Sequence, residues 1–125
     1  MTKLQEAIET VTKDILQRVK NAKLDTQWVR DLEAKGLSDT EIINCGWCVD
    51  WAEELQEALS KTMPELGAYA AHIDLITGND DLFGHCVLVV GSTYYDSECL
   101  TGTSDINQLP FVKRQQKYAK DSKHN

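Results

Sequence analysis

The amino-acid sequence predicts a single α+β domain, with helices in its first half and a small antiparallel sheet in its second half. Up to residue 61, apolar residues recur every three or four positions, which is typical of amphipathic helices. From Gly67 onward the pattern changes to short runs rich in β-branched and aromatic residues, separated by glycine-containing turns. At 125 residues the chain is long enough for one hydrophobic core and too short for two.

Two amphipathic helices and one helical turn are expected before a strong central helix. Residues 3–20 place six apolar side chains on one stripe, namely Leu4, Ala7, Ile8, Val11, Ile15 and Val19. A second helix is expected over residues 26–36, and the spacing of a capping box predicts a further helical turn at residues 40–43. The strongest helix is predicted over residues 47–61, because acidic side chains fill its first half and Pro64 prevents its continuation.

The second half of the chain carries the signals of an antiparallel sheet. Two strands are expected over residues 68–77 and 83–90, with a Gly-Asn-Asp turn between them at residues 78–80. Gly91-Ser92 is a two-residue hairpin signal, and it leads into a third strand over residues 93–96. We therefore expect three antiparallel strands packed against the central helix.

We assign residues 1–111 to one domain, in which residues 1–36 form N-terminal helices and residues 44–100 form the core. One helical turn is expected at residues 105–109. The last fourteen residues, 112–125, carry five Lys or Arg and one Asp, a net charge of +4, whereas the preceding part carries −11. Because this segment is polar and terminal, we expect a frayed basic tail.

Composition and charge exclude several classes of partner. The chain carries 13 Lys or Arg against 20 Asp or Glu, a net charge of −7, which argues against nucleic acid because phosphate binding needs a positive face. No apolar run approaches the roughly 18 residues of a membrane span, and the first ten residues lack the apolar segment of a signal peptide. We therefore expect a cytoplasmic protein without a membrane partner, whose four cysteines are free, catalytic or metal-bound.

Three residues have the types and the settings of a nucleophile, a general base and an orienting carboxylate. Cys48 stands at the start of the central helix, where unpaired N–H groups and the helix dipole favour a thiolate. His85 leads the most apolar strand, and Asp96 ends the next strand of the same hairpin, so these two side chains are expected to be neighbours. The order predicts a Cys48-His85-Asp96 triad that needs no cofactor. The structural alternative is a buried inert cysteine, a strand-end histidine and a turn aspartate.

The same residues resemble the papain-like cysteine hydrolases, and most closely their transglutaminase-like branch. Gly46-Trp47-Cys48-Val49-Asp50-Trp51-Ala52 has the form Gly-x-Cys-x-x-x-Ala of that family, while His85 and Asp96 match its histidine and aspartate on successive strands. The resemblance covers residues 44–100. It implies a papain-like core and thiol-dependent acyl transfer at an amide or isopeptide bond, as in a cysteine protease, deamidase or transglutaminase, with a protein or peptide substrate.

The sequence departs from that family in two respects. The chain is short for a transglutaminase-like core, and Cys86 and Val87 stand where the family often has an aromatic residue. The segment that runs from His85 through Asp96 to Leu109-Pro110-Phe111 also resembles small proteins encoded by bacteriophages.

Two further residues are candidates for the oxyanion hole or the substrate cleft, and two acidic residues bear on the charge of the substrate. An oxyanion hole would use the backbone N–H of the nucleophile, with the side-chain amide of Asn44 as a second donor. Trp47 precedes the nucleophile and either walls the cleft or belongs to the core. Asp50 and Glu53 follow the nucleophile on the same helix, and their negative charge favours a cationic or amine-bearing substrate.

Three other interpretations compete with the triad. Cys45-Gly46-Trp47-Cys48 is a CxxC motif at a helix start, as in redox proteins, although the polar segment before it is unlike the apolar strand that precedes such motifs. A zinc site would combine Cys45 and Cys48 with ligands chosen from His85, Cys86 and Cys99, yet no second tight pair is present. A non-catalytic binding or inhibitory module on the same scaffold is the third.

Overall fold

The computed structural model describes residues 2–76 and 82–122, and over these residues it confirms the α+β class. The helices are α1 (Lys3–Asp25), α2 (Gln27–Ala34), α3 (Asp39–Gly46), α4 (Cys48–Thr62) and α5 (Pro110–Ser122), with short 3₁₀ segments η1 (Pro64–Leu66) and η2 (Ile106–Gln108). The sheet holds β1 (Tyr69–Ile76), β2 (Leu82–Val90), β3 (Thr93–Asp96) and β4 (Cys99–Thr103), in that order and antiparallel throughout. None of the described helices combines the length and the apolar character that crossing a membrane requires.

The N-terminal helices begin and end where local chemistry directs them. Thr2 and Ser38 cap α1 and α3, because each hydroxyl accepts a hydrogen bond from a backbone N–H three residues later. The turn predicted at residues 40–43 is a complete eight-residue helix, α3, so three helices rather than two precede the central one. Trp47 separates α3 from α4 and has non-helical backbone angles (φ −122°, ψ 15°). Cys48 is therefore the first residue of α4.

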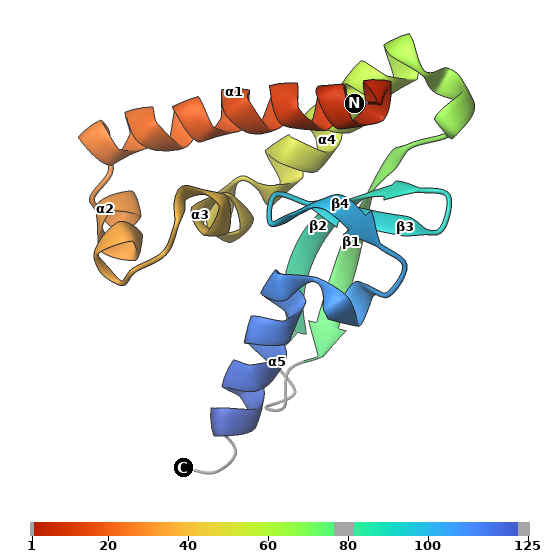
Figure 1. Cartoon of the computed structure of the whole chain (residues 1–125). Helices are drawn as coiled ribbons and strands as arrows, with labels where there is room; N and C mark the ends of the chain where they lie inside the picture. Colours follow the sequence, from red (N-terminus) through yellow and green to blue (C-terminus); the bar gives the residue numbers. More distant parts are fainter. Residues whose placement is uncertain (1, 77–81, 123–125) are drawn as a thin grey trace.

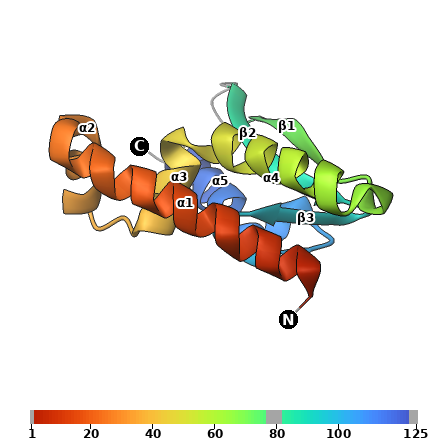
Figure 2. The same cartoon turned by 90° about the horizontal axis from the view of Figure 1, so that it is seen from above.

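Helix α1 packs along α4 (Figures 1 and 2). The indole N–H of Trp51 donates a 2.9 Å hydrogen bond to the hydroxyl of Thr12, which itself donates to the carbonyl of Ile8 at 2.6 Å. All three residues are buried, and the apolar stripe predicted on residues 3–20 supplies the α1 side of this contact. The orientation of α4 relative to the rest of the molecule therefore depends on α1.

The sheet has a helical layer on each face, with α1 and α4 on one side and α5 on the other (Figure 1). Alternate residues of β2 point to the two faces, as in any strand. Cys86 and Leu88 join the large core beneath α4, whereas Val87 and Val89 pack with residues of the C-terminal segment. The hairpin predicted at Gly91-Ser92 is confirmed, because Val90 pairs with Thr93 on either side of it. The Gly-Asn-Asp turn predicted at residues 78–80 lies outside the described residues.

The fourth strand and the fifth helix correct two expectations. The sequence predicts three strands, yet Cys99–Thr103 form a fourth, β4, which pairs with β3. Only glycine is accommodated at position 102, because a Cβ atom there would lie 2.5 Å from Thr93 Cγ2. The φ of Gly102 is 82°, a backbone conformation that also favours glycine. The segment 112–125 was expected to be a frayed tail, but α5 extends to Ser122 because Leu109 and Val112 are buried against the sheet.

We predict that Leu109→Ala lowers the free energy of unfolding by about 2–5 kcal/mol, because it leaves a cavity between the C-terminal segment and the sheet. Urea denaturation measures the change. Lys113→Ala, at an exposed position on α5, is the matched control and should change stability by less than about 0.5 kcal/mol. Equal stability of the two variants would contradict the packing of this layer on the sheet.

Candidate active site

The thiol of Cys48 lies at the N-terminus of α4, where the sequence predicted it. The residue is half-buried and packs at the margin of the main hydrophobic core. Burial opposes ionisation of the thiol, but the interaction with His85 and hydrogen bonds from the backbone N–H groups of Cys86 and Val49 outweigh it. The pKa of Cys48 is therefore below its ordinary value of 9.0. A lowered thiol pKa is characteristic of reactive cysteines.

His85 and Asp96 form a buried pair next to this thiol. The hairpin at Gly91-Ser92 pairs β2 with β3, and Nε2 of His85, within β2, lies 3.1 Å from Oδ2 of Asp96 at the end of β3. His85 is 1% exposed and Asp96 is fully buried. The other oxygen of the carboxylate, Oδ1, accepts a hydrogen bond of 2.9 Å from the backbone N–H of Glu98. Both oxygens of Asp96 therefore have fixed partners, which holds the imidazole in one orientation.

The second ring nitrogen of His85 is the unusual atom of the site. Nδ1 is buried and has no hydrogen-bond partner among the described residues. Burial disfavours the imidazolium, but the hydrogen bond with Asp96 and the interaction with Cys48 outweigh it and raise the pKa of His85 above 6.5. Because Nε2 is occupied by Asp96, Nδ1 is the ring nitrogen left for the interaction with the Cys48 thiol.

Several residues around this pair were not predicted as site residues. The ring of Phe111 packs on the imidazole of His85, with 4.3 Å between ring centroids and 41° between the planes. Arg114, also on α5, forms an ion pair with Glu98. The only sequence signal for these contacts was the apolar run Leu109-Pro110-Phe111 just before the basic segment, which the charge of that segment obscured.

The two cleft candidates have other partners as well. The side-chain nitrogen of Asn44, assigned to the oxyanion hole, donates a 2.8 Å hydrogen bond to Glu98, while its oxygen is buried and unpaired among the described residues. Trp47 lies against Trp28, with ring centroids 6.2 Å apart, and Trp28 is 47% exposed. Gly46 allows this approach, since a Cβ atom there would lie 2.8 Å from the Trp28 ring. The cleft roles of Asn44 and Trp47 stay predictions.

The remaining cysteines differ from Cys48 in their surroundings. Cys45 is exposed in the last turn of α3, and Cys99 is half-buried on β4. Burial raises the pKa of Cys86 to about 11, with smaller contributions from Cys48 and Glu53. All four thiols are free. Within residues 2–76 and 82–122, no three His, Cys, Asp or Glu side chains are grouped as metal ligands, so the residues of the zinc alternative do not converge.

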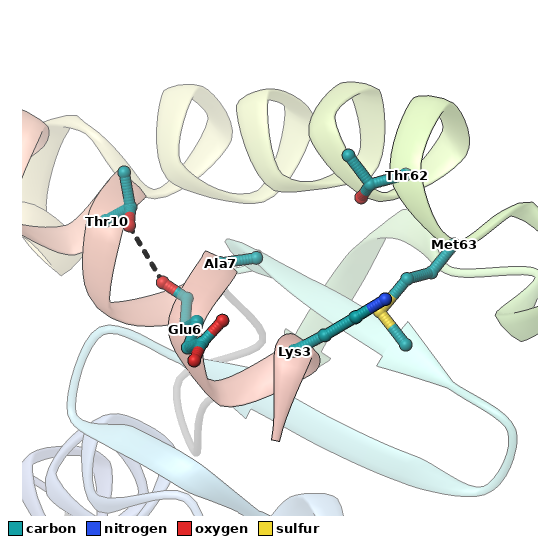
Figure 3. A pocket seen from close by; sticks show the side chains of 6 residues that line it. All are labelled: Lys3, Glu6, Ala7, Thr10, Thr62 and Met63. Carbon is teal, nitrogen blue, oxygen red and sulfur yellow. Dashed lines mark hydrogen bonds between the residues drawn. The ribbon is translucent and has the colours of Figure 1, made fainter. Parts of the chain in front are cut away.

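A hollow of about 370 Å³ lies at the opposite end of α4 from Cys48 (Figure 3). It is bounded by the start of α1 and the end of α4, and its lining residues are Lys3, Glu6, Ala7, Thr10, Thr62 and Met63. At about 1.5 Å per helical residue, Thr62 is about 20 Å from the nucleophile end of α4. This hollow is therefore not part of the triad site.

No protein-family model, no curated protein and no solved structure matches this chain. The function is therefore inferred from the geometry and electrostatics of the site.

We predict that the imidazole of His85 titrates above pH 6.5, and that Asp96→Asn lowers its pKa, because burial is then opposed by fewer partners. NMR titration of the ring resonances measures both values, with His85→Gln used to assign the signal. The exposed His72 on β1 supplies a reference resonance that should be the same in both proteins. A His85 ring that titrates below 6.5 in the unmodified protein, or that ignores the Asp96 substitution, would contradict the electrostatics described above.

Proposed function

We propose that this protein catalyses thiol-dependent acyl transfer at an amide or isopeptide bond of a protein or peptide. One observation supports the proposal above all others. A buried His85–Asp96 hydrogen bond at 3.1 Å lies beside a half-buried cysteine whose pKa is lowered, and the second nitrogen of that histidine is unpaired. Buried titratable groups with perturbed pKa values are characteristic of functional sites.

Each member of the triad has a defined role in this reaction. Cys48 Sγ attacks the acyl carbon, and its proton passes to Nδ1 of His85. The imidazolium then delivers that proton to the leaving amine as the carbon–nitrogen bond breaks, which leaves a thioester on Cys48. Asp96 holds the ring and stabilises its charged form. Water or a second amine, deprotonated by His85, attacks the thioester and releases the free thiol.

The arrangement also supports catalysis over a purely structural role for the three residues. A buried ion pair or charged hydrogen bond contributes little net stability compared with apolar side chains of the same volume. Stability alone therefore does not account for two titratable groups at 0–1% exposure beside a half-buried cysteine whose pKa is lowered. General base chemistry accounts for both features.

Exposed acidic residues near Cys48 favour a cationic substrate. Asp50 and Glu53 are both exposed on the first two turns of α4. The charge of Glu53 also contributes to the raised pKa of Cys86, the residue that follows His85. A lysine side chain or another primary amine would be attracted to this face, either as part of the acyl donor or as the acceptor.

We predict that p-nitrophenyl acetate acylates Cys48, detected as a single acetyl adduct by peptide mass spectrometry and as a burst of p-nitrophenolate. Cys48→Ala should abolish the adduct and leave the melting temperature nearly unchanged. His85→Ala should slow acylation by about 10²- to 10⁴-fold, the range typical of general base catalysis. Asp96→Asn should slow it less, because the base is retained.

Cys99→Ser is the control for this experiment, since it removes a half-buried thiol outside the triad and should leave the burst intact. Loss of folding in Cys48→Ala would show that the residue belongs to the core. Absence of acylation, together with no selective labelling of Cys48 by iodoacetamide near neutral pH, would favour the binding or inhibitory module instead.

We predict that the double variant Asp50→Asn/Glu53→Gln raises KM for a lysine p-nitrophenyl ester by about two- to fivefold, the size of effect expected for exposed charges. Steady-state kinetics measure the change, and kcat should be nearly constant. The matched control, Glu9→Gln/Glu65→Gln, removes two exposed acidic charges remote from the start of α4 and should leave KM unaltered. An equal effect of both double variants would mean that only the net charge matters.

A further inference from the structure

Helix α5 contacts the buried pair directly through an aromatic ring. Phe111 is 3% exposed, and its ring centroid lies 4.3 Å from that of His85. The guanidinium carbon of Arg114, one turn later, lies 5.6 Å from the centroid of the Phe111 ring. The Phe111 ring therefore packs on the imidazole of His85, and the guanidinium of Arg114 packs on the Phe111 ring.

The same arginine is also connected to Asp96 by a second route. Arg114 donates two hydrogen bonds to the carboxylate of Glu98, at 2.6 and 2.8 Å, in the fork geometry that only arginine offers. Asn44 from α3 adds a third donor at 2.8 Å. The backbone N–H of Glu98 is the group that donates to Asp96 Oδ1. The ion pair therefore fixes the residue that orients the triad carboxylate.

This pair is less exposed than the ion pair of Lys61 and Glu57 on the surface of α4. The side chains of Arg114 and Glu98 are 30% and 9% exposed, against 72% and 68% for Lys61 and Glu57 on α4. Exposed pairs contribute little to stability or geometry. A partly buried, bidentate pair restricts both partners much more strongly.

We infer that Arg114, Glu98 and Phe111 are positioning residues, which hold Asp96 and His85 in the orientation that makes Cys48 reactive. This inference deepens the proposed function and rests on it. Arg114 and Glu98 act on Asp96 through the turn at residues 96–98, while Phe111 acts on the imidazole by packing against one face of it. Helix α5 is then a functional part of the site and not only a cover for the sheet.

When Glu98 is substituted, a positioning role and a simple charge effect predict opposite shifts in the pKa of Cys48. Removal of a nearby negative charge should lower the pKa of any thiol, whereas loss of the anchor for Asp96 should raise that of Cys48 by weakening the His85 interaction. The pKa of Cys45 serves as a measure of the charge effect alone. Partial burial raises the pKa of Cys45, and in addition Arg114 lowers it and Glu98 raises it through charge.

The experiment is the pH dependence of iodoacetamide alkylation at Cys48 and Cys45, resolved by peptide mass spectrometry in the full-length protein. Glu98→Ala should raise the pKa of Cys48 while it lowers that of Cys45. A rise of one unit reduces the Cys48 alkylation rate at pH values below the pKa about tenfold, because the thiolate is the reacting species. Arg114→Gln should raise both values.

Two further variants separate position from charge and protect the test against misfolding. Arg114→Lys keeps the charge but loses the fork, so it should raise the pKa of Cys48 and leave that of Cys45 unchanged. Lys113→Gln removes a positive charge from the exposed neighbour on α5 and should not affect Cys48. Circular dichroism and thermal melts identify any variant that does not fold, and Arg114→Lys then decides the question.

The outcomes separate this inference from the proposed function. If the unmodified protein shows an ordinary thiol pKa at Cys48, the proposed function fails and the inference fails with it. If that pKa is low but Glu98→Ala lowers it further, or Arg114→Lys leaves it unchanged, only the positioning role is overturned. Opposite shifts at the two cysteines would support it.

Discussion

The buried carboxylate of Asp96 is the interaction on which the rest of the site depends. An ionised group without solvent needs a partner for each oxygen, or its burial costs several kcal/mol. His85 meets one oxygen, and the backbone N–H of Glu98 meets the other. The second bond requires the chain to turn immediately after β3, so the end of that strand and the start of β4 are set by the same carboxylate that orients the imidazole. The hydrogen bonds of Asp96 therefore determine both the geometry of the site and the position of the turn between β3 and β4.

That turn also joins the layers of the fold. Ser97 donates a 2.8 Å hydrogen bond to the carbonyl of Thr40 in α3, and Glu98 receives hydrogen bonds from Asn44 of α3 and Arg114 of α5. Helices that precede and follow the sheet in the sequence therefore meet at Ser97 and Glu98. A shift of α3 or α5 would reach Asp96 through hydrogen bonds of 2.6–2.9 Å, with no flexible segment between. The site is consequently sensitive to packing that lies outside the triad.

The sequence predicted the parts of this arrangement that depend on local rules. A two-residue turn sets the register of a hairpin, so the proximity of His85 and Asp96 followed from Gly91-Ser92 alone. The position of Cys48 at a helix start followed from the apolar period of α4. Helix α5 was missed because five basic residues in the last fourteen outweighed its few apolar ones, and β4 because its Thr and Gly are typical of loops. The cluster around Glu98 joins residues 16 and 54 positions away, which no periodicity encodes.

The resemblance to cysteine hydrolases was confined to residues 44–100, yet the contacts that place the nucleophile lie mostly outside that range. Helix α1 holds α4 through the Trp51–Thr12 hydrogen bond and the apolar residues beside it. Because Cys48 is the first residue of α4, a rotation of that helix about its axis would carry the sulfur away from the imidazole, which the sheet holds still. The distance between thiol and ring is thus set by two independent supports, α1 for the helix and the 96–98 turn for the sheet. In this chain of 125 residues, α1 supports the helix that carries Cys48, while α5 and the 96–98 turn hold the histidine–aspartate pair.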